Sequence, residues 1–138
     1  MRKYVFEVLE EVSKAKKKQD KISILKSNES WPLKDVLRGS IDSKVEWDIP
    51  KGEPPYTPAE VHNHPANLHR ENKKFSYFVK GGKGGSMPKF KRERLFIGML
   101  EGIHPKDAEL VVGMINKKPP KGVTRKLVEE TFPGLLQD

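Results

Sequence analysis

Apolar residues near both ends of the chain recur at intervals of three and four positions, the spacing of one helix face. At the start, this spacing predicts a helix over residues 2–15, in which Glu10 and Lys14 form a favourable pair one turn apart. Its apolar face consists of Val5, Val8, Leu9 and Val12. Such a stripe is stable in water only when it is buried against another element.

Two more helices are predicted in the first third of the chain. One covers about residues 19–27. The other begins after Ser30, a residue type that accepts a hydrogen bond from a first-turn amide, and it carries Pro32 in its first turn. Gly39 is expected to end it.

Helical spacing returns at about Lys89. The first helix of this second block is expected to end at Gly102 and Ile103, as a glycine stop followed by an apolar residue. Pro105 then opens the next helix, and a last short helix covers about residues 123–131. The apolar positions of the first helix are Phe90, Leu95, Phe96, Met99 and Leu100.

The segment between these blocks is irregular in pattern. Four prolines within residues 50–58 exclude a long helix or a central strand there. The glycine-rich residues 80–86 are typical of a flexible loop. Phe75 and Phe78, three positions apart among lysines, either hold a short helix to the core or stack on bases; we favour the first interpretation.

These patterns together predict an all-α fold. We expect a small bundle of five to six short helices with a long irregular, Pro/Gly-rich basic central segment. The chain is interpreted as one domain, 1–138, made of a helical block 1–47, an irregular insert 48–88 and a helical block 89–136.

The positive net charge of the chain indicates the chemical class of its partner. The net charge is +8 and 27 of the 138 residues are Lys or Arg, so a polyanion is the default partner. The excess lies in the second half, where residues 73–94 hold eight basic residues and a single acid, Glu93. Cysteine is absent, which excludes a disulfide framework and fits a reducing compartment. No apolar run approaches membrane-spanning length and no signal-peptide pattern opens the chain, so we expect no membrane partner.

The most informative stretch is a basic turn that opens directly into the last helix. Backbone N–H groups at a helix N-terminus lack partners and carry partial positive charge, so this corner is predicted to bind phosphate. The candidate residues of the corner are Lys117, Lys118, Lys121, Gly122, Val123, Thr124, Arg125 and Lys126. The basic loop and the helix after it add Lys83, Lys89, Lys91 and Arg92.

No pattern indicates catalysis. His62, His64 and His69 lack the His-Glu-x-x-His spacing of a zinc helix, and we expect no metal. The glycine-rich loop is neither a P-loop nor a dinucleotide fingerprint, so we expect no cofactor. No Ser-His-Asp set or converging carboxylate pair stands out, and the chain is predicted not to be an enzyme.

Residues 89–136 resemble the end of the all-helical N-terminal DNA-binding domain of ATP-dependent DNA ligases, most closely the T-even phage type. The first block, from Val5 to Leu37, is similar to that family's opening helices. The matching residues are Phe96, Leu100, Gly102, Ile103, Asp107–Val111, Gly122–Thr124, Lys126–Val128 and Phe132–Leu136. The ligase motif Lys-x-Asp-Gly does not occur. The resemblance implies a DNA-gripping domain that holds duplex DNA across the minor groove, with Gly122–Thr124 at the turn and basic side chains beside them.

The sequence thus predicts a non-catalytic, sequence-nonspecific duplex-DNA-binding protein that grips the phosphate backbone. The resemblance implies a tailed-phage protein in the cytoplasm of the infected host cell, or in the virion. An alternative is a protein-interaction or structural accessory, such as a virion component or host-enzyme inhibitor, that uses the domain only as a scaffold. A small nuclease built on His62, His64 and His69 is the weakest hypothesis.

Overall fold

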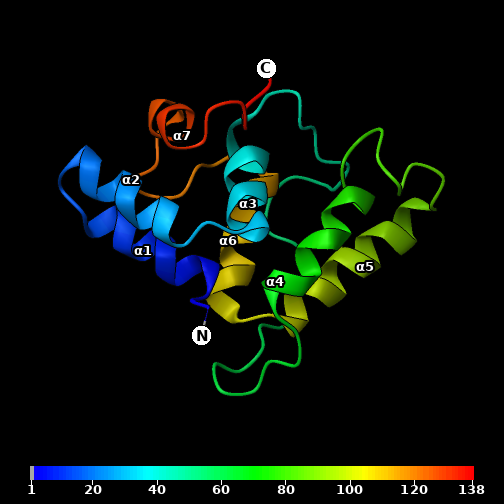
Figure 1. The fold of residues 1–138 in the computed structure, drawn as a ribbon. Helices are drawn as coiled ribbons and strands as arrows, with labels where there is room; N and C mark the ends of the chain where they lie inside the picture. Colours follow the sequence, from blue (N-terminus) through cyan, green and yellow to red (C-terminus); the bar gives the residue numbers. More distant parts are fainter. Residues whose placement is uncertain (1) are drawn as a thin grey trace.

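A computed structural model describes residues 2–138, and this part of the chain is helical (Figure 1). It confirms the all-α prediction: no strand is formed within residues 2–138, where pairing is limited to two isolated β-bridges. The helices are α1 (Val5–Lys14), α2 (Lys18–Ser27), α3 (Trp31–Ile41), α4 (Leu68–Glu71), the 3₁₀-helix η1 (Asn72–Tyr77), α5 (Lys89–Gly102), α6 (Pro105–Ile115) and α7 (Arg125–Thr131).

Local signals set several helix ends. The Ser30 hydroxyl accepts from the Leu33 amide at 3.3 Å and caps α3, as predicted. Pro105 occupies the first turn of α6. α5 ends at Gly102 as expected, but Gly102 is not left-handed, so the predicted glycine stop of the Schellman type does not form.

The core is built around α3 and α6, which contact each other near the centre of the molecule (Figure 1). α1 contacts both α2 and α6, α7 lies against α2, and α5 lies against α6. Buried apolar side chains from both helical blocks form one cluster. The fold therefore joins the first third of the chain to the last third.

The central segment 48–88 has no helix over residues 48–67, as its prolines predicted, but it also contributes to this core. It forms α4 and η1, which lie against α3. Phe78 is fully buried, and its ring meets Phe96 edge-on at 5.1 Å. Phe75 is buried as well. The two aromatic side chains therefore hold a short helix to the core and are not exposed for stacking on nucleobases. Because α4 and η1 follow no long apolar pattern, the helix count exceeds the five or six expected.

The glycine-rich loop folds back onto η1. A Cβ at Gly84 would lie 2.0 Å from the Tyr77 carbonyl oxygen, so only glycine fits this approach. The Lys83 amide donates to the Ser76 carbonyl at 2.9 Å. The loop that composition described as flexible is therefore held by backbone contacts.

Candidate nucleic-acid interface

Lys117, the first residue of the predicted phosphate corner, has a structural role. Its ammonium donates to three main-chain carbonyls, those of Gly39 at 2.9 Å, Asp42 at 2.7 Å and Val45 at 2.7 Å. These carbonyls belong to the end of α3 and the turn after it, where helical acceptors lack partners. The Lys117 charge is thus used inside the fold and is not presented to a phosphate.

Arg92 is also part of the fold, although the sequence placed it with the DNA-binding residues. It is 7% exposed. Its guanidinium donates to the Asp48 carbonyl at 3.0 Å and to the Gly84 and Met87 carbonyls at 3.2 Å each, and it pairs with the Asp48 carboxylate at 3.2 Å. Arg92 holds the glycine-rich loop against α5.

Arg125 lies at the surface but is engaged with the end of the chain. Its two terminal nitrogens donate to the Asp138 carboxylate at 2.9 and 2.7 Å, and one also reaches the Ile41 carbonyl at 3.1 Å. Asp138 in turn accepts from the Ser43 amide and hydroxyl, both at 2.9 Å. These bonds hold the pKa of Asp138 well below its usual range.

Gly122, Val123 and Thr124 shape the turn that leads into α7. Gly122 has φ +81°, and a Cβ there would lie 2.8 Å from the Cα of Ser13 at the end of α1. Val123 is buried, and the Thr124 hydroxyl accepts from the Leu127 amide at 3.1 Å. The turn therefore packs against α1. One of the backbone amides at the start of α7, that of Leu127, already has the Thr124 hydroxyl as its acceptor.

The three remaining lysines of this corner are exposed: Lys118, Lys121 and Lys126. Because Gly122 rests on Ser13, the corner lies beside the α1–α2 turn. The Lys21 ammonium donates to the Gly122 carbonyl at 3.0 Å, and Lys18 of α2 pairs with Glu130 of α7. Figure 1 shows α2 and α7 as neighbours, in agreement with their contacts.

The α1–α2 turn brings three more exposed or partly exposed lysines to this side of the molecule. We call the combined set the lysine surface: Lys14, Lys16, Lys17, Lys118, Lys121 and Lys126. Within residues 2–138 their ammonium groups have no ion pair, since the ion pairs of this region use Lys18 and Lys106 instead. The sequence reasoning omitted the first three, although four lysines within residues 14–18 were a visible signal.

Lys83, Lys89 and Lys91 are exposed as well, but they lie elsewhere. They belong to the glycine-rich loop and the first turn of α5, and Figure 1 shows these segments on the opposite side of the molecule from α7. Phe90 between them is 67% exposed. The twelve predicted residues therefore separate into a corner at α7 and a group at α5.

The histidines contribute to structure. The Tyr4 hydroxyl lies 3.2 Å from Nε2 of His64, and Nε2 of His69 lies 3.1 Å from the Lys3 carbonyl. Nδ1 of His104 accepts from the Lys106 amide at 3.1 Å and caps α6, and burial lowers the pKa of His104. Across residues 2–138, no cluster of three or more His, Cys, Asp or Glu side chains could hold a metal ion.

One buried acid links the starts of two helices. Asp107, in the first turn of α6, accepts from the Phe6 amide in the first turn of α1 at 2.9 Å. Burial raises the pKa of Asp107 to about 6, although the hydrogen bond from Phe6 opposes this shift. The carboxyl group is inaccessible and acts as a cap for α1 rather than as a catalytic acid.

The sequence profile of one protein family, described as a family of unknown function (DUF6433), matches residues 8–121. The chain belongs to this family. No curated protein matches the chain. No helix in the described part of this DUF6433 chain is long and apolar enough to cross a membrane.

The DUF6433 match extends from within α1 to the basic turn after α6. It includes both turns that meet in the lysine surface, with Lys126 alone among the six lysines lying beyond it. The family description states no activity.

Proposed function

We propose that the chain binds duplex DNA without sequence preference and without catalysis, by holding backbone phosphates with the lysine surface. The observation that carries this proposal is the meeting of two lysine-rich turns, from opposite ends of the chain, around the contact between Gly122 and Ser13. Within residues 2–138, the six ammonium groups carried by these turns and by α7 are exposed and have no ion pair.

The chemistry of these groups favours phosphate over base edges. A lysine ammonium is a hydrated point charge on a flexible stem, which suits phosphate contact and lacks the planar fork that reads guanine. Arg92 and Arg125, which could read bases, are engaged with carbonyls and carboxylates inside the protein. Contacts of the lysine type position a protein on DNA but carry no sequence information.

Two sequence properties support the same proposal. The net charge of +8 makes counterion release from a polyanion favourable. The resemblance of residues 89–136 to the DNA-gripping domain of ATP-dependent ligases also favours a duplex ligand. Since no Lys-x-Asp-Gly motif occurs in the chain, the proposal does not include strand joining.

The test is a binding series with labelled duplexes of two unrelated sequences, measured by fluorescence anisotropy at several salt concentrations. Six phosphate contacts predict a slope of about −5 for log K against log salt, which is a loss of about a thousandfold between 50 and 200 mM salt. Both sequences should give the same affinity. An affinity that stays flat with salt would refute phosphate binding.

Two triple variants with equal net charge separate a local site from a general charge effect. Lys118→Glu, Lys121→Glu and Lys126→Glu together should abolish binding. Lys83→Glu, Lys89→Glu and Lys91→Glu together remove the same charge on the other side of the molecule and should retain most of it. Equal losses in the two variants would mean that net charge alone attracts DNA and that the lysine surface is not the site.

A further inference from the structure

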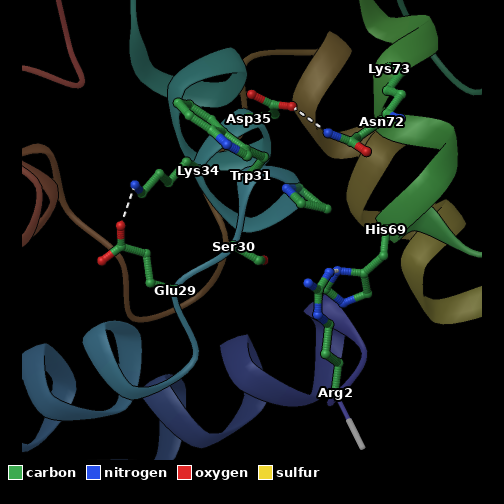
Figure 2. Close-up of a pocket in the computed structure, with 10 residues that line it drawn as sticks. Arg2, Glu29, Ser30, Trp31, Lys34, Asp35, His69, Asn72 and Lys73 are labelled. Carbon is green, nitrogen blue, oxygen red and sulfur yellow. Dashed lines mark hydrogen bonds and ion pairs between the residues drawn. The ribbon is translucent and has the colours of Figure 1, made fainter.

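A second candidate site is lined by residues that do not belong to the lysine surface. It is a cavity of about 590 Å³ between the start of α3, η1 and the N-terminal segment (Figure 2). This volume is within the range of small-molecule sites. Its lining combines an exposed aromatic, a hydrogen-bonded polar pair and several cations, none of which the lysine surface uses.

The aromatic is Trp31, the first residue of α3, which is 69% exposed. The Lys34 ammonium lies 5.0 Å from the ring centroid, so the ring already accepts a cation contact. An indole left in water at the edge of a cavity is a stacking platform for a flat ring, and aromatic side chains stack on nucleobases in this way. Figure 2 shows the indole beside Asp35 at the rim of the cavity.

The polar pair consists of Asp35 and Asn72. Asn72 Nδ2 donates to Asp35 Oδ2 at 2.9 Å, joining α3 to η1 across the cavity (Figure 2). Asn72 is only 9% exposed, and its Oδ1 has no hydrogen-bond partner within residues 2–138. Because Asn72 Oδ1 is itself shielded from solvent, it does not face the open cavity, and the Asp35 carboxylate is the acceptor that a ligand can reach. Asp35 lies one turn after Trp31 on the same face of α3, so both groups can address one ligand.

The cations lie at the ends of the cavity. Arg2 has no acidic partner within residues 2–138, and one of its terminal nitrogens lies 3.5 Å from Nδ1 of His69. Lys73 is exposed and extends from η1 at the upper edge in Figure 2. Lys34 is paired with Glu29 and remains beside Trp31. Arg2 and Lys73 are therefore the groups free to hold an anion.

We propose that this cavity binds one unpaired nucleotide, with its base on Trp31, its amino-bearing edge at Asp35, and its phosphate at one of the two free cations, Arg2 or Lys73. The two oxygens of a carboxylate can accept two hydrogen bonds at once, so Asp35 complements two adjacent donors. Guanine presents N1–H and N2–H₂ together, adenine and cytosine present one amino group, and thymine presents none. The preference is thus guanine first and thymine last.

This site is independent of the lysine surface, and the experiment keeps the two apart. Titration with dGMP, followed by tryptophan fluorescence and calorimetry, should quench Trp31, and Trp31→Ala should weaken binding by about tenfold or more. Phe90→Ala, which removes a comparably exposed aromatic outside the cavity, should leave dGMP binding unchanged. Asp35→Asn should reduce the preference for dGMP over dTMP.

Further arms identify the ligand. Inorganic phosphate should bind far more weakly than dGMP, and a hairpin with one guanine overhang distinguishes a strand end from a free nucleotide. The triple Glu variant of the lysine surface should lose duplex binding but retain dGMP binding. Equal binding of dGMP, dTMP and phosphate, or a Trp31→Ala protein that binds dGMP like wild type, would overturn the proposal. So would a protein partner that covers Trp31 while dGMP does not bind.

Discussion

Lys117 and Lys118 are adjacent, but Lys117 is expected to stabilise the fold and Lys118 to bind phosphate. Replacing each of them by methionine tests the two roles separately. Lys117→Met keeps most of the side chain's length and apolar stem but removes the ammonium that bridges the Gly39, Asp42 and Val45 carbonyls. Those carbonyls lie at the end of α3 and in the turn after it. The substitution therefore removes the hydrogen bonds that join this end of α3 to the turn after α6.

The expected loss follows from the three hydrogen bonds. A typical intramolecular hydrogen bond contributes about 1 kcal/mol net, and bonds from charged donors contribute more. Lys117 is only half-buried, so water replaces part of what is lost and the lower value applies. The free energy of unfolding should fall by about 3 kcal/mol, which for a chain of this size lowers Tm by roughly 10 °C.

The assay is urea unfolding followed by circular dichroism, with duplex affinity measured on the same samples at a temperature where both variants are folded. Lys118 is exposed and unpaired in the described part of the chain, so Lys118→Met should change stability by less than about 0.5 kcal/mol. It should nevertheless weaken DNA binding and make the salt slope shallower by about one unit. If Lys117→Met were as stable as wild type, the bridging role assigned to Lys117 would be refuted.

Three further substitutions test other parts of the structure. Gly122→Ala forces a side chain into a left-handed conformation against Ser13, and should cost about 2 kcal/mol or more in urea unfolding; an unchanged midpoint would contradict the close seating on α1. The pKa of Asp107 is higher in the folded than in the unfolded state, so its proton is bound more tightly when the chain is folded. The free energy of unfolding of the wild type should therefore fall by up to about 3 kcal/mol as pH rises from about 4 to above 6. Asp107→Asn should remove that slope, and two parallel pH profiles would show that another group is responsible. Arg92→Leu should release the glycine-rich loop, so that thermolysin cleaves within residues 80–88 faster than in wild type; an equal cleavage rate would mean that backbone contacts alone hold the loop.

Most of the helices that the sequence predicted have a repeated apolar face, and α3 and α6 also have a local signal at their start. Ser30 and Pro105 act within one turn of the residues they cap, so their effect is visible in a short stretch of sequence. α4 was missed, and η1 was anticipated only from Phe75 and Phe78, because the burial of this segment depends on single contacts such as that of Phe78 with Phe96. A single contact of that kind leaves no periodic pattern of apolar residues in the sequence.

The candidate site shows the same division between local and distant information. Charge density singled out lysines, but Lys117 and Lys118 look alike in sequence, since the carbonyls that bind Lys117 are more than 70 residues away. Lys16 and Lys17 were left out for a related reason. Their turn becomes part of the lysine surface only through the seating of Gly122 on Ser13, which is a property of the packed chain.

The Asp107 cap on α1 has a consequence for how the chain folds. The first helix completes its N-terminal hydrogen bonding only when a residue 101 positions later has arrived, and Lys21 reaches the Gly122 carbonyl over the same separation. Closing loops of this length is slow compared with forming the helices themselves. During synthesis, the two turns of the lysine surface remain apart until the last helices leave the ribosome. A nascent or truncated chain therefore lacks the composite surface, and the proposed duplex binding is expected only from a chain that has completed folding.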